Sequence, residues 1–158
     1  MNLNETPLLF QFETASSDNL KFMPMIVRFH LDQLGLRISF AQWQALSYDD
    51  RRLLARFPAD GNAQTTADFG RALTTMLHTH AQAEAEPFAP EASPAWQGVT
   101  AVPDDVLRQT QLAHLVAPSV TQWAKLAPFQ RYVLCKLSRK PEVHRDFVPA
   151  MHEFGLSQ

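Results

Sequence analysis

The feature that most constrains the fold is the pattern S-x-x-Q-W, which occurs twice with a spacing of 80 residues. Shifting the chain by 80 positions aligns residues 27–54 with residues 107–134 without a gap. Seven of the 28 aligned pairs are identical, where composition alone would give about one or two. These pairs are Arg28/Arg108, Ser39/Ser119, Gln42/Gln122, Trp43/Trp123, Leu46/Leu126, Arg51/Arg131 and Leu54/Leu134. The repeat predicts a duplicated helical unit; the alternative is that an ordinary helix start occurred twice.

Helical signals recur along the rest of the chain. Pro24 suits a first helical turn, Gly35 suits a helix end, and serine followed by glutamine three residues later forms a capping box. In the helix that we expect Thr65 or Thr66 to cap, His80 shares the apolar spacing of the inner face. Apolar spacing predicts helices over about 24–34, 39–45, 47–57, 65–85, 104–116, 128–139 and 146–154.

These signals predict an all-α fold. We expect a compact two-lobed helical bundle with an internal duplication of about 24–57 and 104–139. Residues 8–12 alternate two phenylalanines around a glutamine and predict a short extended N-terminal segment against the helical body.

The 158 residues fit a single helical domain, 1–158, with a core of its own. Residues 86–103 contain four prolines and predict an irregular crossover between the two halves. Phe88 and Trp96 are expected to anchor this crossover, because a disordered linker would not carry two large aromatic residues.

Composition excludes several classes of protein. The net charge of −2 lacks the basic excess of a dedicated nucleic-acid binder, and no apolar run approaches the about 18–20 residues of a membrane span. The first residues lack the pattern of a signal peptide, so we expect a cytoplasmic protein. One cysteine excludes an intrachain disulfide and a thiolate metal cluster within the chain.

Motifs for catalysis or metal binding are missing from the sequence. There is no Gly-rich phosphate loop and no G-x-S-x-G pattern, and His78 and His80 are expected on opposite faces of a helix. Cys135 lies one turn from both Arg131 and Arg139, which could activate its thiol, but the apolar stripe around it favours packing. We therefore predict no enzymatic activity, no cofactor and no metal site.

Basic residues gather near the end of the chain, at Arg131, Lys136 and Arg139. They could dock an acidic partner or an anion, although cations near a helix C-terminus are also common on solvated surfaces. Arg28 and Arg51 stand at aligned positions of the first half. These five cations are the candidate partner- or anion-binding residues.

Two motifs resemble the nitrate reductase-associated protein family. They are P-M-x-V-R-x-x-L-D-x-x-G, which begins at Pro24, and Q-R-x-x-x-x-K-L-S-R, which ends at Arg139. The segments 20–37, 123–139 and 146–156 carry the similarity in colinear order, and the central crossover matches mainly at Pro94 and Trp96.

The resemblance implies an accessory protein of nitrate assimilation without catalysis of its own. Its expected partner is nitrate reductase or the machinery that matures it. Family members often carry cysteines where this chain has Phe22, Leu34 and Ala59, so a thiolate-based redox role is not expected here. The alternative is a sensor of a small molecule or anion, with its ligand between the two helical lobes. The sequence leaves the oligomeric state open.

Overall fold

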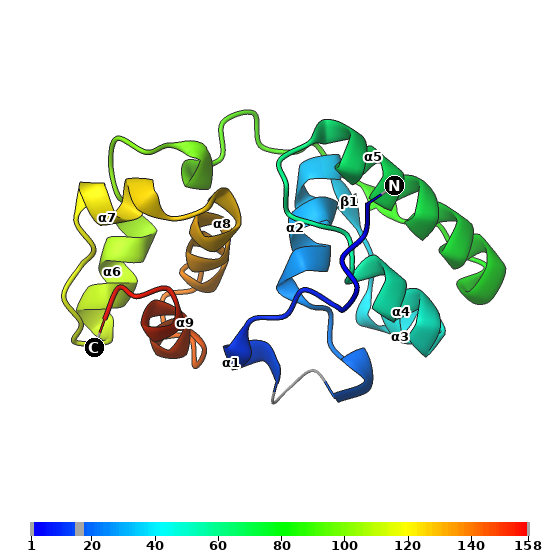
Figure 1. Ribbon diagram of the computed structural model, residues 1–158, viewed down its shortest axis with the longest axis horizontal. Helices are drawn as coiled ribbons and strands as arrows, with labels where there is room; N and C mark the ends of the chain where they lie inside the picture. Colours follow the sequence, from blue (N-terminus) through cyan, green and yellow to red (C-terminus); the bar gives the residue numbers. More distant parts are fainter. Residues whose placement is uncertain (1, 15–17, 158) are drawn as a thin grey trace. The chain divides into compact units, whose positions relative to one another are not determined.

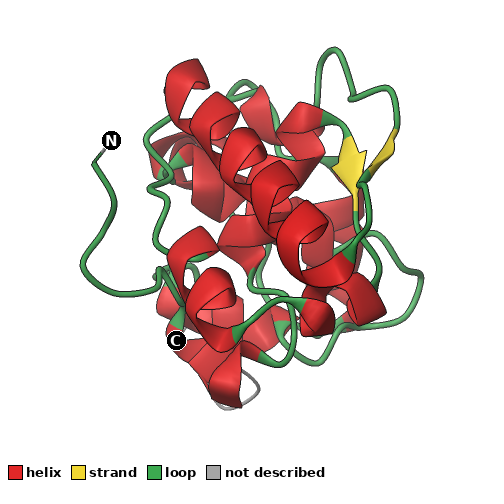
Figure 2. Ribbon diagram, turned by 90° about the vertical axis from the view of Figure 1, so that its right-hand side faces the viewer, coloured by secondary structure: helices red, strands yellow, loops and turns green. Residues whose placement is uncertain are grey.

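The computed structural model describes residues 2–14 and 18–157, and it confirms the predicted all-α class. Nearly all regular structure in these residues is helical (Figure 2). The α-helices are α1 (Gln11–Thr14), α2 (Met25–Leu34), α3 (Phe40–Ala45), α4 (Tyr48–Leu54), α5 (Ala63–Met76), α6 (Asp104–Leu112), α7 (Val120–Lys125), α8 (Pro128–Leu137) and α9 (Phe147–Glu153).

The chain divides into two compact units, Met1–Glu91 and Ala92–Gln158. The first contains α1 to α5 and the second contains α6 to α9 (Figure 1). The boundary falls inside the proline-rich crossover predicted at 86–103. Each half of the sequence repeat therefore lies in a different unit.

In the first unit, α2 packs against α5, and α4 also contacts α5. Apolar residues recur on one face of each helix, so their burial drives this packing. The fully buried side chains from these helices and the turn after α4 are Ile26, Val27, Leu54, Phe57, Phe69 and Leu73.

The N-terminal segment lies against the first unit. The amides of Asn4 and Leu8 donate hydrogen bonds of 2.8 Å to the carbonyl oxygens of Arg56 and Ala55, directly after α4. The extended segment predicted at 8–12 is wrong for Gln11 and Phe12, which lie in the short helix α1; the Glu13 carboxylate accepts a hydrogen bond from the Phe10 amide and helps to close this helix. The same carboxylate accepts a 2.7 Å hydrogen bond from the amide of Met25 and so fixes the start of α2.

Helix α5 begins earlier than predicted, because the side chain of Asn62 caps it rather than Thr65 or Thr66. The helix then widens into a π-helical turn, η2 (Leu77–Ala81). The wider turn changes the register of the side chains. The prediction that His80 lies on the inner face is wrong, since its side chain is 41% exposed.

A two-stranded antiparallel sheet ties the end of the first unit to α2. β1 (Leu36–Arg37) pairs with β2 (Glu86–Pro87), and these are the strands in Figure 2. The amide of Phe88 donates a 2.8 Å hydrogen bond to the carbonyl oxygen of Gly35. The crossover is therefore fixed to the first unit near Phe88, as predicted.

The second unit is built around α8, which packs against α6, α9 and the short 3₁₀ helix η3 (Ala95–Gln97). Trp96 contacts Tyr132 edge to face, with ring centroids 6.0 Å apart, so the crossover is anchored at this end too. Helix α6 ends at Leu112, short of the predicted residue 116, and His114 then adopts a φ of 58°. Fully buried side chains of this unit include Val106, Trp123, Val133, Leu134, Phe147 and Met151.

The two copies of S-x-x-Q-W form the same local structure. The Ser39 hydroxyl accepts from the Gln42 amide at 3.0 Å, and the Gln42 side chain accepts from the Ser39 amide at 2.8 Å. The corresponding distances at Ser119 and Gln122 are 3.1 Å and 2.8 Å. Both predicted capping boxes are confirmed; a common origin of the two halves stays a prediction.

Candidate functional site

Arg131 lies inside the second unit rather than on its surface. Its side chain is on α8, the residue is only 6% exposed, and its Nε donates a 2.8 Å hydrogen bond to the carbonyl oxygen of Trp96. Its Nη1 donates to the carbonyl oxygen of Leu126 at the end of α7. The guanidinium thus joins η3 and α7 to α8 and is largely used within the second unit; the docking role of Arg131 stays a prediction.

Arg51, the aligned residue of the first unit, has a different environment. It is half-buried on α4, and its Nε is shielded from solvent without a hydrogen-bond acceptor in the described part of the chain. A buried guanidinium nitrogen without an acceptor is energetically costly. Among the predicted site residues, Arg51 therefore has a buried donor nitrogen that the described residues leave unused.

Arg28 and its aligned residue Arg108 both contact backbone. Arg28 is half-buried, and its Nε donates a 3.1 Å hydrogen bond to the carbonyl oxygen of Met23 just before α2. Arg108 donates to the carbonyl oxygens of Ser138 and Lys140, at 2.6 Å and 3.1 Å, beyond the end of α8. Both arginines hold a loop in place.

The remaining predicted cations lie at the end of α8. Lys136 is half-buried in its last turn, and Arg139 is exposed two residues after the helix ends. Positive charge here complements the helix dipole. Cys135 is half-buried beside them. The predicted site residues therefore divide between the units: Arg28 and Arg51 belong to the first, the other three to the second.

His30 is a buried polar residue to which the sequence analysis gave no role. Its Nδ1 lies 2.9 Å from Thr66 Oγ1 and its Nε2 lies 3.1 Å from the carbonyl oxygen of Pro58. A carbonyl oxygen only accepts, so Nε2 carries the proton and Nδ1 accepts from the hydroxyl. Burial lowers the pKa of His30 from 6.5 to about 4, against a smaller opposing effect of the Pro58 hydrogen bond. A neutral His30 thus joins α2 to α5 and to the turn after α4.

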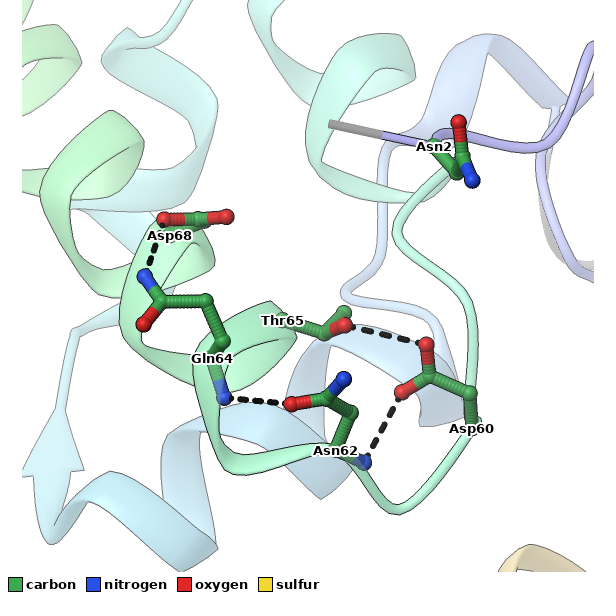
Figure 3. A pocket seen from close by; sticks show the side chains of 6 residues that line it. All are labelled: Asn2, Asp60, Asn62, Gln64, Thr65 and Asp68. Carbon is green, nitrogen blue, oxygen red and sulfur yellow. Dashed lines mark hydrogen bonds between the residues drawn. The ribbon is translucent and has the colours of Figure 1, made fainter.

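A pocket of about 320 Å³ lies at the start of α5 (Figure 3). Asp60 accepts hydrogen bonds from the amide of Asn62 and the hydroxyl of Thr65, both at 3.0 Å. Gln64 Nε2 donates to Asp68 at 2.9 Å. These hydrogen bonds hold the start of α5 in place. This structural role is enough to explain why polar residues gather here. The pocket is lined by Asn2, Asp60, Asn62, Gln64, Thr65 and Asp68.

Other titratable side chains contact one another in pairs. His80 Nδ1 contacts Asp50 Oδ2, and His78 Nε2 lies 3.6 Å from Glu84 Oε1. Among the residues that the structure describes, no three His, Cys, Asp or Glu side chains gather where they could hold a metal ion.

Phe22 and Phe40 form a surface feature that the sequence analysis missed. Their rings stack with centroids 5.5 Å apart, yet the residues are 49% and 48% exposed. The available signal was an aromatic residue directly after the capping serine Ser39, at a position outside the apolar stripe of the helix. Its contact with Phe22 depends on tertiary structure and could not be read from spacing.

A comparison with known protein families shows to which family this chain belongs. The sequence model described as conserved nitrate reductase-associated protein matches residues 9–154. The chain belongs to this family. None of the curated proteins and none of the solved structures matches the chain.

Membership in the nitrate reductase-associated family confirms the resemblance given by the two sequence motifs. The match runs from the segment before α1 to the end of α9 and so includes both units. The motif that begins at Pro24 forms α2 and its C-terminal glycine, and the motif that ends at Arg139 forms most of α8. The two sequence motifs therefore include α2 and α8, the helices against which other helices of their units pack.

Among the residues that the structure describes, no helix is both long enough and apolar enough to cross a membrane.

Proposed function

We propose that this protein is a non-catalytic accessory protein of nitrate assimilation. It acts in the cytoplasm, where it binds nitrate reductase or its assembly machinery and supports the maturation, stability or activity of the enzyme. The observation that carries the proposal is the family match over residues 9–154, because the family is described by its association with nitrate reductase.

The roles of the reactive side chains support a binding function rather than catalysis. His30 joins three segments of the first unit, and the carboxylate of Asp60 is used within the cap of α5. Arg131 is bound to two backbone carbonyl oxygens. General acid–base chemistry needs a titratable group that is free to exchange a proton with a substrate, and these groups are engaged in structure.

The charged residues that we assign to partner contact are Arg28, Arg51, Lys136 and Arg139. Arg131 is left out because it is buried. Cations of this kind contribute mainly to specificity and to the rate of association with an acidic surface.

A tagged copy of the protein, expressed in nitrate-grown and ammonium-grown cells, tests the proposal. We expect nitrate reductase or one of its assembly factors to co-purify from nitrate-grown cells. In a deletion strain, enzyme activity and the amount of reductase polypeptide should be measured together. Lower activity at constant polypeptide indicates a role in maturation or activity, whereas loss of polypeptide indicates a role in stability. Normal growth on nitrate together with failed co-purification would refute the proposal.

A second candidate function is anion sensing, and one observation favours it. The Nε of Arg51 and that of Arg108 are both shielded and without an acceptor among the described residues, so each could donate to a bound anion. A thermal-shift screen with nitrate, nitrite, molybdate and nucleotides tests this function. A shift with one anion that Arg51→Gln abolishes supports sensing, and no shift with any of them removes it.

A further inference from the structure

The stacked pair Phe22 and Phe40 is unusual for a protein surface. The ring planes are inclined by only 27°, and about half of each residue remains in contact with water. Aromatic side chains gain most from burial and are enriched at the centres of protein interfaces. The pair thus has the chemistry of a binding hot spot.

Two hydrogen bonds from side chains to the backbone, one on each side of Phe22, fix the position of this residue. The carbonyl oxygen of Leu20 accepts from Trp43 Nε1 at 2.8 Å, and that of Met23 accepts from Arg28 Nε at 3.1 Å. Phe40 is the first residue of α3 and lies within the capping box, directly after Ser39. Because hydrogen bonds hold the backbone next to both residues, little entropy is lost in ordering the rings when a partner binds.

Two cations lie close to Phe22. The ammonium group of Lys21 lies 5.7 Å from the centroid of the Phe22 ring. Arg28 Nε donates a 3.1 Å hydrogen bond to the carbonyl oxygen of Met23, the residue after Phe22. Arg37 lies 3.8 Å from Glu86, but both side chains are largely exposed, so this ion pair is weak. The charge complements an acidic partner.

We propose that Phe22, Phe40 and Lys21 form a docking surface for an acidic segment of a protein partner. An aromatic or aliphatic side chain of that segment packs on the two rings, and a neighbouring carboxylate pairs with Lys21. This inference rests on the proposed function, since it assigns to nitrate reductase or its assembly machinery a specific place of contact.

Purified variants and an array of overlapping 15-residue peptides from the nitrate reductase of the same organism test the surface. The double variant F22S/F40S removes the rings and K21E reverses the charge. V120S is a matched control, because Val120 is also the first residue of a helix, lies directly after the capping serine of a Ser–Gln box and is 47% exposed. Y48S controls for loss of an exposed aromatic residue elsewhere, since Tyr48 is also 47% exposed. Circular dichroism confirms that each variant is folded.

We expect the wild-type protein to select acidic peptides that contain an aromatic or aliphatic residue. Binding should fall at least about 10-fold in F22S/F40S, as for a hot spot of about 1.4 kcal/mol, and at least about 3-fold in K21E. Both controls should remain within about 2-fold of wild type. Equal binding by wild type and F22S/F40S, or a wild type that selects no acidic peptide, would overturn the proposal.

Two further measurements separate this surface from other occupants and from the proposed function. Sedimentation velocity detects self-association; a dimer that F22S/F40S abolishes would mean that the surface binds a second copy, which also overturns the proposal. Co-purification is repeated with tagged F22S/F40S. If variant and wild type recover the reductase equally, the surface proposal fails and the proposed function stands. If neither recovers it, the proposed function fails, and the peptide array still decides the surface.

Discussion

The indole Nε1 of Trp43 donates a 2.8 Å hydrogen bond to the carbonyl oxygen of Leu20, a residue held in the left-handed region at φ 52°. Asn19 before it has a φ of 56°, so two consecutive non-glycine residues adopt this costly conformation. Trp43 is fully buried, and Leu20 is 3% exposed. The tryptophan therefore fills the core and also stabilises the strained turn that leads into α2.

Replacing Trp43 with phenylalanine should destabilise the protein by about 2–4 kcal/mol, because it leaves a buried carbonyl oxygen without a donor and a cavity beside it. Trp123→Phe is the matched control. Trp123 Nε1 donates at 2.9 Å to the carbonyl oxygen of Gly98, an exposed residue, so water can replace the donor and the loss should be about 1–2 kcal/mol. Urea unfolding measures both values, and equal losses would contradict this account.

The features that the sequence predicted well are those that depend on neighbouring residues. Ser39 and Ser119 each cap a helix through a glutamine three residues later, so their role can be read from spacing alone. The helix preceded by Pro24 and ended by Gly35 was predicted for the same reason. Such short-range signals were sufficient for the all-α class.

The features that were missed depend on distant partners. Arg131 was predicted as a docking residue because it is charged, but its acceptor at Trp96 lies 35 residues away in sequence. His30 acquires its role from Thr66, which lies 36 residues away. The π-helical turn that exposes His80 has no clear signal in local composition. Candidate sites read from charge patterns alone therefore included a residue that serves the core.

Protonation of His30 should make stability depend on pH. Its pKa in the folded chain is about 4, below the ordinary 6.5 of the unfolded chain, so the unfolded state binds the proton first as pH falls. The contribution of neutral His30 is fully present above about pH 6.5 and decreases toward pH 4, by about 3 kcal/mol in all. Urea unfolding at several pH values between 7 and 4 measures this decrease.

The His30→Leu variant isolates that effect. It should be less stable than wild type at pH 7, since it loses both hydrogen bonds, and its stability should fall less between pH 6.5 and pH 4. His152 is exposed, so His152→Gln should keep the wild-type dependence. A pH profile of His30→Leu parallel to that of wild type would show that another group is responsible.

Gly35→Ala should be among the most destabilising glycine substitutions. Gly35 has a φ of 71°, and an added Cβ would lie 2.4 Å from the carbonyl oxygen of Phe88 and 2.9 Å from Pro90 Cδ. Gly61 has the same φ, but its Cβ would meet nothing within 4 Å. Gly61→Ala should therefore cost about 1 kcal/mol for conformation alone, and Gly35→Ala at least about 2 kcal/mol more. Thermal unfolding of both variants checks the difference; similar losses would mean that the crossover moves freely away from α2.

The aligned arginines allow a direct test of structural against docking roles. Arg131→Lys should lower stability by about 2–3 kcal/mol, because an ammonium group cannot reproduce the paired contacts of the guanidinium with Trp96 and Leu126. Arg51→Lys should change it by less than about 1 kcal/mol, since no acceptor in the described chain is lost. Urea unfolding gives both values, and co-purification with nitrate reductase gives the effect on binding. If Arg131→Lys keeps full stability but loses the reductase, Arg131 contacts the partner after all and its buried position must open on binding.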